Sequence, residues 1–171
     1  MKKLSEIYKE LGIDFTFPIK IEDTRGNETY FENSYGCWYR LEYDENGKVT
    51  YFENSYGCWY RYEYDKDGNK TYFEDSDDYW ERREYDEKGN ETYYEDSDDY
   101  WERREYDKEG NSTYFESSNG FWIRREYDEN GKVTYFETSK GIERGTKRGS
   151  CSGKVVEIDG KKYKLTELWK I

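Results

Sequence analysis

The sequence has no histidine, one proline and three cysteines in 171 residues. Without histidine it cannot build a Ser-His-Asp triad, a Cys-His pair or a histidine-ligated zinc or haem site. No apolar run exceeds a few residues, so we expect no membrane span and no signal peptide. We therefore expect a protein that is not an enzyme and carries no cofactor or metal. The odd cysteine count and the missing signal favour a cytoplasmic location.

The charge balance is acidic, with 40 Asp+Glu against 28 Lys+Arg and a formal net charge of −12. This sign disfavours direct binding to nucleic acid or to an anionic membrane. A chain with 40% charged residues would ordinarily be disordered. Aromatic residues make up 20% of this one, however, and aromatic side chains favour half-buried strands. The composition therefore predicts β-structure with little aliphatic core.

A repeat of 21 residues dominates the chain. Its full units span residues 26–46, 47–67, 68–88, 89–109 and 110–130, and a sixth decays by about residue 145. Each unit reads as a β-hairpin, with strands such as Thr71–Glu74 and Trp80–Tyr85. A Y-D-x-x-G turn joins successive units, with Gly free to take a positive φ and form a bulge. N-S-Y-G or D-S-D-D supplies the turn inside a unit. The sequence predicts an all-β antiparallel meander of about a dozen strands.

Segments of different composition flank the repeats and divide the chain into three parts. Residues 1–18 form an N-terminal helical cap, with a short helix over 4–12, Ser5 as N-cap and Gly12 just after its end. Residues 19–145 hold the hairpin repeats. Residues 146–171 form a C-terminal hairpin cap with an Asp159-Gly160 turn, reached through a loop over 140–153. Such caps protect the open edges of a repeat sheet.

Alternation along each strand assigns side chains to the two faces of the sheet. In the third full unit we assign one face to Thr71, Phe73, Trp80, Arg82 and Glu84. The other face then receives Tyr72, Glu74, Tyr79, Glu81, Arg83 and Tyr85. Stacked units would align identical residues into ladders along the sheet, where cross-strand aromatic and Arg–aromatic pairs stabilise it.

The repeat resembles the YD repeats of Rhs and teneurin-type proteins. The matching residues are Tyr64-Asp65, Gly68-Asn69, Thr71 and Gly57 or Gly120, and the resemblance covers roughly residues 21–141. That family implies hairpins wound into a shell around a toxin. Five units cannot enclose a toxin, so the shell function is not transferred. The layout also looks like small tandem-repeat proteins of phages and their bacterial hosts. A weaker likeness is to aromatic cell-wall-binding repeats, whose paired Gly-Trp signature is absent.

The cysteines and the turn aspartates offer little chemistry. Cys37 and Cys58 hold the same slot in successive units, two strands or about 9.6 Å apart, whereas a disulfide needs Cα atoms within about 7 Å. They are fillers of half-buried positions or, alternatively, reactive thiols. The Asp65–Asn69 turn resembles a calcium loop but fails the EF-hand pattern. Carboxylate pairs suited to glycoside hydrolysis will arise by chance in so acidic a chain, and repetition argues against a unique catalytic site.

Negative charge is concentrated in the repeats. Residues 1–139 carry a net charge of −17 and residues 140–171 carry +5. The third and fourth full units contribute −4 and −6, and their turns form an acidic rim. The rim is either a solvated edge that maintains solubility or an array of anions that imitates a nucleic-acid backbone. Its candidate binding residues are Glu74, Asp75, Asp77, Asp78, Glu95, Asp96, Asp98 and Asp99.

The recurring tryptophans, which are Trp38, Trp59, Trp80, Trp101 and Trp122, either pack the repeats together or serve as binding platforms. The sequence as a whole predicts a non-catalytic acidic repeat protein that binds another macromolecule. The partner we favour is a basic nucleic-acid-binding protein, and the role we favour is a phage-type inhibitor that occupies a nucleic-acid-binding groove of a host defence protein. Binding of glycan or cell wall through Trp and Tyr platforms is the alternative, and a purely structural module is another.

Overall fold

The computed structural model describes residues 2–141, 143–145, 155–158 and 161–164. Helix α1 spans Leu4–Glu10 and precedes every strand. The strands are β1 (Ile19–Glu22), β2 (Glu28–Glu32), β3 (Trp38–Tyr43), β4 (Val49–Asn54), β5 (Trp59–Tyr64), β6 (Lys70–Asp75), β7 (Trp80–Tyr85), β8 (Glu91–Asp96), β9 (Trp101–Tyr106), β10 (Ser112–Ser117), β11 (Trp122–Tyr127), β12 (Val133–Thr138), β13 (Glu143–Gly145), β14 (Val155–Ile158) and β15 (Lys161–Lys164).

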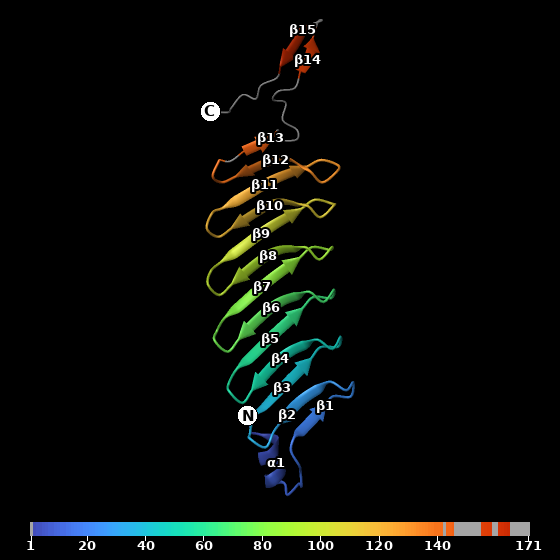
Figure 1. Ribbon diagram of the computed structural model, residues 1–171, viewed down its shortest axis with the longest axis vertical. Helices are drawn as coiled ribbons and strands as arrows, with labels where there is room; N and C mark the ends of the chain where they lie inside the picture. The colour runs from blue at the N-terminus through green and yellow to red at the C-terminus, as the bar shows by residue number, and fades with distance from the viewer. Residues whose placement is uncertain (1, 142, 146–154, 159–160, 165–171) are drawn as a thin grey trace. The chain divides into compact units, whose positions relative to one another are not determined.

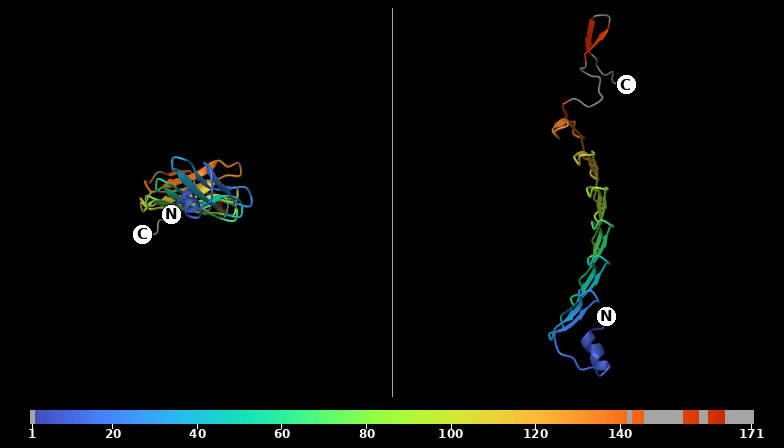
Figure 2. Two further views of the ribbon diagram at one scale, coloured as in Figure 1. Left: turned by 90° about the horizontal axis from the view of Figure 1, so that it is seen from below. Right: turned by 90° about the vertical axis from the view of Figure 1, so that its right-hand side faces the viewer.

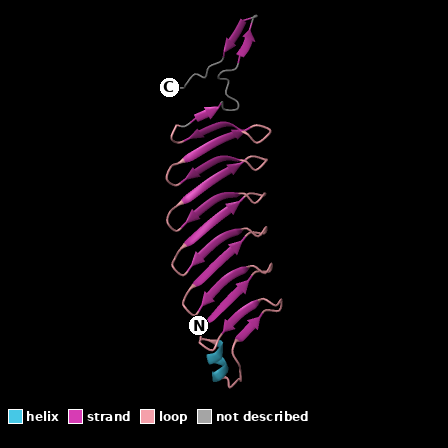
Figure 3. Cartoon of the chain, viewed as in Figure 1, coloured by secondary structure: helices cyan, strands magenta, loops and turns pink. Residues whose placement is uncertain are grey.

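Strands β1 to β13 follow one another in chain order in one antiparallel sheet, and β14 pairs with β15 (Figures 1 and 3). The predicted all-β meander is confirmed. Its first strand begins at Ile19, as expected. The loop expected over residues 140–153 is wrong at Glu143–Gly145, which pair with β12. The reason is that Gly141 closes one more turn of the repeat, with its N–H 3.0 Å from the carbonyl oxygen of Thr138. Residues 146–154, including Cys151, and the Asp159-Gly160 turn lie outside the described residues.

The chain divides into two compact units: residues 1–85 with 94–99, and residues 86–93 with 100–171. Within each unit the strands form a single layer, seen edge-on in Figure 2. Buried hydrophobic side chains are therefore few. Among the described residues only Ile19, Tyr30 and Tyr135 reach that class, with exposed fractions of 6%, 7% and 3%. Side chains gain burial from neighbours along the sheet instead of from a second layer.

The turns between repeats explain why Asp and Gly recur at fixed positions. The N–H of Gly47 donates to the carbonyl of Asp44 at 3.2 Å, and the N–H of Asp44 donates to the carbonyl of Lys48 at 2.9 Å. Gly47 has a φ of +81°, which glycine adopts without steric cost. The Asp44 carboxylate accepts from the N–H groups of Asn46 and Lys48 at 2.9 and 2.8 Å. This is the predicted type I turn with a glycine bulge.

The turn inside each repeat, which we call the tip turn, has the same geometry. In the first repeat the N–H of Gly36 donates to the carbonyl of Asn33 at 3.0 Å, and Gly36 has a φ of +78°. The third and fourth repeats place aspartate where Gly36 stands. Asp78 and Asp99 have φ values of +63° and +60°, the two positive-φ residues other than glycine in the described chain.

The predicted face assignment is wrong for one strand of each hairpin. Across the tip turn, Phe73 pairs with Glu81 and Tyr72 pairs with Arg82, so each pair shares a face. The cause is the length of the loop, since three residues separate Asp75 from Tyr79, which close the turn. We call the side with Tyr72, Glu74, Trp80, Arg82, Glu84 and their equivalents the Tyr–Trp face. The side with Phe73, Glu81, Arg83 and their equivalents is the Phe face.

Rings stack along the Phe face in the first unit. The centroids of Phe31 and Tyr39 are 5.2 Å apart, those of Phe52 and Tyr60 are 5.6 Å apart, and those of Tyr60 and Phe73 are 5.9 Å apart. Further along the same face, ion pairs replace the rings. Glu81 is buried, with an exposed fraction of 8%. Its carboxylate lies 2.7 Å from Lys70 Nζ and 2.8 Å from the Arg83 guanidinium. The rings of Tyr60 and Phe73 thus join the second repeat to the third, whereas the Glu81 ion pairs lie within the third repeat.

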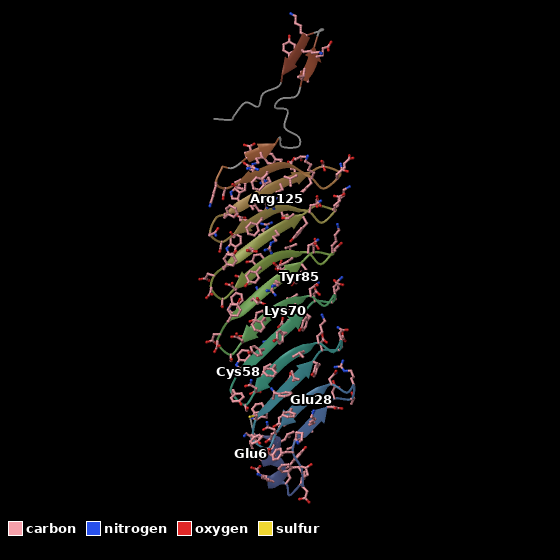
Figure 4. All side chains as sticks on the ribbon, viewed as in Figure 1. Glu6, Glu28, Cys58, Lys70, Tyr85 and Arg125 are labelled. Atoms are coloured by element: carbon pink, nitrogen blue, oxygen red, sulfur yellow. The ribbon has the colours of Figure 1, made fainter. Side chains whose placement is uncertain are left out.

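One tyrosine in every repeat bonds its strand to the preceding strand of the same hairpin. Tyr85 donates its hydroxyl hydrogen to the carbonyl of Lys70 at 3.1 Å, and Figure 4 labels both residues. The same bond, always spanning 15 residues, recurs at 2.8–3.1 Å in the pairs Tyr43–Glu28, Tyr64–Val49, Tyr106–Glu91 and Tyr127–Ser112. These hydroxyls explain why the YD tyrosine is Tyr and not Phe.

Replacing Tyr64 by Phe tests this bond, because it removes the hydroxyl and keeps the ring. We expect the free energy of unfolding to fall by about 1 kcal/mol, as is typical for one lost hydrogen bond. Urea denaturation followed by circular dichroism measures the change. Tyr35→Phe is the control, since Tyr35 is 91% exposed, and it should leave the midpoint unchanged. Equal effects of the two substitutions would contradict the assignment.

Helix α1 completes the first repeat on the Tyr–Trp face, and Ser5 is not its N-cap. The N-cap is Lys3, and Gly12 follows the helix at a φ of +66°, as predicted. Ser5 is buried, and its hydroxyl and backbone N–H donate to Glu32 at 2.5 and 3.0 Å. Tyr30 accepts a bond from the N–H of Leu4 at 3.2 Å and donates to Glu32 at 3.0 Å.

The residue that faces Glu32 across the strands explains why α1 is needed to bond this carboxylate. The equivalent glutamates Glu53 and Glu74 pair across the sheet with Arg40 and Arg61. Glu32, 1% exposed, faces Ile19 instead. Ile19 stands where the later strands carry Arg40 and Arg61, so donors from α1 take the place of the missing arginine.

Substitution of Ser5 by Ala should therefore be costly. It removes a hydroxyl donor from a buried carboxylate, and such bonds to charged groups contribute about 1.5–3 kcal/mol. We expect a loss of that size in urea denaturation. Ser34→Ala, at an exposed tip turn, should cause almost none, and a Ser5 variant as stable as the Ser34 variant would refute the role.

Candidate functional site

The eight candidate rim carboxylates all lie in the first unit, in the tip turns of the third and fourth repeats. The structure separates them by exposure. Four are exposed at the turn: Asp77, Asp78, Asp98 and Asp99. The other four are half-buried at strand ends: Glu74, Asp75, Glu95 and Asp96.

Asp75 and Asp96 stabilise the tip turns that they begin, through hydrogen bonds to their carboxylates. The Asp75 carboxylate accepts from the N–H groups of Asp77 and Tyr79 at 2.9 and 3.2 Å. Asp96 accepts from the N–H of Asp98 at 3.0 Å and from the Tyr94 hydroxyl at 3.1 Å. Asn33 does the same in the first repeat, because its side-chain oxygen accepts from the N–H groups of Tyr35 and Cys37 at 3.0 and 3.1 Å. These two aspartates are therefore turn residues.

Glu74 belongs to the Tyr–Trp face, where it pairs across the strands with Arg61 and Trp80. A carboxylate opposite an arginine is partly neutralised, unlike the carboxylates at the turn. The charges free to meet a partner are thus the four exposed aspartates. Separating Glu74 from these four aspartates requires the pairing register of the strands, which the repeat pattern alone does not reveal.

Sequence reasoning missed two exposed tyrosines on the same edge. Tyr35 and Tyr56 are 91% and 78% exposed, and they occupy the turn position that Asp77 and Asp98 hold in later repeats. The signal was present, since the middle of an N-S-Y-G turn cannot pack against the sheet. The tip edge of the first unit therefore carries two tyrosines and then two pairs of aspartates.

The five repeated tryptophans are half-buried on the Tyr–Trp face. In the first unit Trp38 stacks on Tyr30, with ring centroids 6.3 Å apart and planes at 11°. In the second unit Trp122 pairs across the strands with Glu116. This burial supports the packing role.

The remaining candidate chemistry is sparse. Cys37 and Cys58 are free thiols, as predicted, and Cys37 Sγ lies 3.4 Å from the Tyr56 hydroxyl oxygen. Among the residues that the structure describes, no group of three or more Cys, Asp or Glu is arranged to hold a metal ion. Within that same part of the chain, no helix is long and apolar enough to cross a membrane.

Comparisons with known proteins return fold neighbours only. No family model matches the chain, and no curated protein matches it. A crystal structure of TcdB2-TccC3-Cdc42 is similar at 15% identity and a TM-score of 0.47, over 80% of this chain and 8% of that one. The Photorhabdus luminescens Tc holotoxin pore with mutation TccC3-D651A is similar at 15% identity and a TM-score of 0.43, over 71% of this chain and 9% of that one. The chain spans less than a tenth of the length of these proteins.

The turns between repeats carry the main electrostatic signature. The side-chain amide of Asn27, with backbone N–H groups, lowers the pKa of Asp23 to about 2. The amides of Asn69, Asn90 and Asn111 likewise lower the pKa of Asp65, Asp86 and Asp107. Each Asn lies four residues after its Asp and donates at 2.9–3.0 Å. The ionised carboxylate is thus the form that the folded turn favours.

Acid should therefore destabilise the protein through these turns. A pKa lower in the folded than in the unfolded chain adds stability above the ordinary aspartate pKa of 3.8, and that stability is lost as the pH falls through the folded pKa. We expect the urea midpoint to drop between about pH 4 and pH 2, the window set by these lowered pKa values.

Asp65→Asn should reduce the stability at neutral pH and also flatten its loss in acid, because the variant has no carboxylate to protonate. Asp67→Asn, at an exposed position of the same turn, should keep the wild-type pH dependence. Parallel pH profiles for wild type and Asp65→Asn would exclude the turn carboxylates as its cause.

Proposed function

We propose that this protein is a non-catalytic binding module of YD-type repeats, and that its acidic tip turns bind a basic surface of a protein partner. The observation that carries the proposal is the presence of Asp78 and Asp99 at positive φ. Four other tip turns place glycine there: Gly36, Gly57, Gly120 and Gly141. An L-residue in this conformation costs about 1 kcal/mol relative to glycine, and aspartate somewhat less.

The two strained aspartates add charge where charge is already dense. Each of these two tip turns exposes a pair of neighbouring carboxylates, as in Asp77-Asp78. Equivalent turns are two strands or about 9.6 Å apart, so the edge presents about one carboxylate per 5 Å. A nucleic-acid strand presents one phosphate per about 3.4 Å. The tip edge is thus a sparser anion row of the same kind.

A groove that binds nucleic acid is the partner surface that best suits such a row, since it is lined with Lys and Arg. The role we propose is that of a phage-type inhibitor which occupies this groove on a host defence protein in the cytoplasm. The acidity of the edge and the resemblance of the layout to phage repeat proteins support this. The exposed Tyr35 and Tyr56, next along the same edge, add the residue type that is enriched at protein interfaces.

The test removes charge without weakening the fold. Asp78→Gly with Asp99→Gly deletes two carboxylates and relieves the strained backbone, so the variant should be more stable than wild type. We expect it to capture less of the basic proteins from bacterial lysate, as quantified by pull-down with mass spectrometry. Duplex DNA added to the lysate should compete with the wild-type protein for the same partners.

The matched control is Glu45→Gln with Asp67→Asn, which deletes two exposed carboxylates at the opposite ends of the strands. It should capture as much as wild type. If the glycine variant also captures the wild-type set undiminished, the proposal is wrong, because its greater stability excludes unfolding as an explanation.

A further inference from the structure

Strand β1 leaves one edge of the sheet open. It is the first strand of the sheet, and among the described residues no strand pairs with its outer edge (Figure 1). Its equivalent β3 uses the corresponding edge to bond β2 across the tip turn. An unpaired row of N–H and C=O groups is a template on which another strand can add.

The backbone groups of Lys20 and Glu22 point to this open edge. The carbonyl of Ile21 faces β2, because it accepts from a threonine hydroxyl of β2 at 3.2 Å. The N–H of Asp23 also faces β2, since it donates to the carbonyl of Asn27 at 2.8 Å. Backbone groups alternate in direction along a strand, so those of Lys20 and Glu22 point away from β2. Both residues are exposed.

Exposed apolar side chains lie on β1 and on the segment that joins it to α1. Leu11, Ile13, Phe17 and Ile21 have exposed fractions of 67%, 47%, 40% and 38%. Phe17 directly precedes the strand region and packs against Phe15, with ring centroids 5.3 Å apart. Apolar surface beside an unpaired strand edge is typical of an interaction site. The edge therefore suits a partner that supplies a strand together with apolar side chains.

Ile21 lies at the centre of this edge. Its side chain lines a space of about 910 Å³ against α1, together with Leu4 and Ile7, and it still remains exposed. Side chains alternate along a strand, so Ile21 lies on the Tyr–Trp face and its neighbours Lys20 and Glu22 lie on the Phe face. The edge thus presents one apolar side chain between a cation and an anion.

We propose that β1 pairs with β1 of a second copy of this chain, in an antiparallel and twofold-symmetric arrangement. Lys20 of each copy lies opposite Glu22 of the other, and Ile21 lies opposite Ile21. The outward backbone groups of Lys20 and Glu22 are then all bonded, because a hydrogen-bonded antiparallel pair exchanges both of its N–H···O bonds. Opposite charges meet on the Phe face and the two isoleucines meet on the Tyr–Trp face.

The charges on β1 select this register. Bonded pairs must form between residues with outward backbone groups, which by the same alternation are Pro18, Lys20 and Glu22. An axis at Lys20 would oppose two ammonium groups and would set Pro18, which has no N–H, against Glu22. An axis at Glu22 would oppose two carboxylates. The axis at Ile21 avoids both conflicts, and a second copy then supplies the complementary charges by symmetry, which favours it over an unrelated strand.

This pairing closes at two copies, because it occupies the open edge of β1 in each of them. The twofold axis is perpendicular to the sheet, as between any two adjacent antiparallel strands. The tip turns of the two first units consequently lie on opposite sides of the joined sheet and remain accessible. The pairing of copies is therefore independent of the proposed protein interface.

Sedimentation equilibrium of the full-length protein tests the pairing. We expect twice the chain mass of 20.9 kDa at concentrations of about 100 µM. Glu22→Lys should raise the Kd of the dimer about tenfold, since it opposes two lysines in each pair. Lys20→Glu combined with Glu22→Lys restores opposite charges in the register about Ile21 and should recover the affinity. Glu45→Lys, the same change at an exposed turn position, is the matched control and should leave the Kd unchanged.

Cysteine cross-linking measures the register independently. With the three native cysteines replaced by serine, Ile21→Cys should form a disulfide between two copies, because opposite residues of a non-hydrogen-bonded pair have Cα atoms about 4.5 Å apart. Glu22→Cys is the matched control, since its two copies would lie about 8 Å apart, beyond the reach of a disulfide.

Three results would overturn the proposal. The first is a monomer at every concentration measured, for a protein whose circular dichroism shows the β-sheet intact. The second is an equal change of the Kd by Glu22→Lys and Glu45→Lys. The third is an equal yield of disulfide for Ile21→Cys and Glu22→Cys, which would place the contact in another register or at another surface.

Discussion

A sheet one layer thick offers its side chains no interior, and the rest of this structure follows from that constraint. Each ring must bury itself against rings of adjacent strands, as Phe52 and Tyr60 do at 5.6 Å. Each strand must also be held by bonds that do not need a core. The hydroxyl of the YD tyrosine, donated to a carbonyl 15 residues earlier, is one such bond, and the turn carboxylate is another. Stability therefore accumulates by nearest-neighbour contacts, as in other repeat proteins.

The same constraint makes the first repeat a special case. A strand in the middle of the array receives contacts from both sides, whereas β1 has no strand before it. β1 also carries Ile19 where β3 and β5 carry an arginine, so Glu32 on β2 lacks that partner, and the hydroxyl and backbone N–H of Ser5 in α1 donate to it instead. Ile19 and Ile21 adapt β1 to the apolar side of α1. The helix is thus a substitute for a missing repeat, which explains why it lies on the Tyr–Trp face.

The features that could be predicted from the sequence are those fixed by local chemistry. Asp44 and Gly47 identify their turn because the carboxylate and the positive φ both act within five residues. The face of Phe73 could not be predicted in this way, since it depends on the register across a three-residue loop. The residue type of Ser5 predicts a helix N-cap, whereas its actual partner Glu32 lies 27 residues away, which no local pattern indicates. For the acidic rim, the repeat pattern is enough to locate the acidic turns. The strand register and the side-chain exposure are needed to distinguish the four exposed aspartates from Asp75, Asp96 and Glu74.

In the tip turn, the residues that carry exposed charge differ from the residue that stabilises the turn. Its first residue holds the backbone through a side-chain oxygen, whether from Asn33 or from Asp75, so the residues that follow contribute little to the fold. Those positions are Tyr35 and Tyr56 in the first two repeats and Asp77 and Asp98 in the next two, with no change in the hairpin. The Tyr–Trp face behaves in the opposite way, because its Arg and Glu residues also pack the sheet. Substitutions at the tip edge can therefore change the surface offered to a partner without altering the fold, whereas substitutions on the Tyr–Trp face also change contacts between strands.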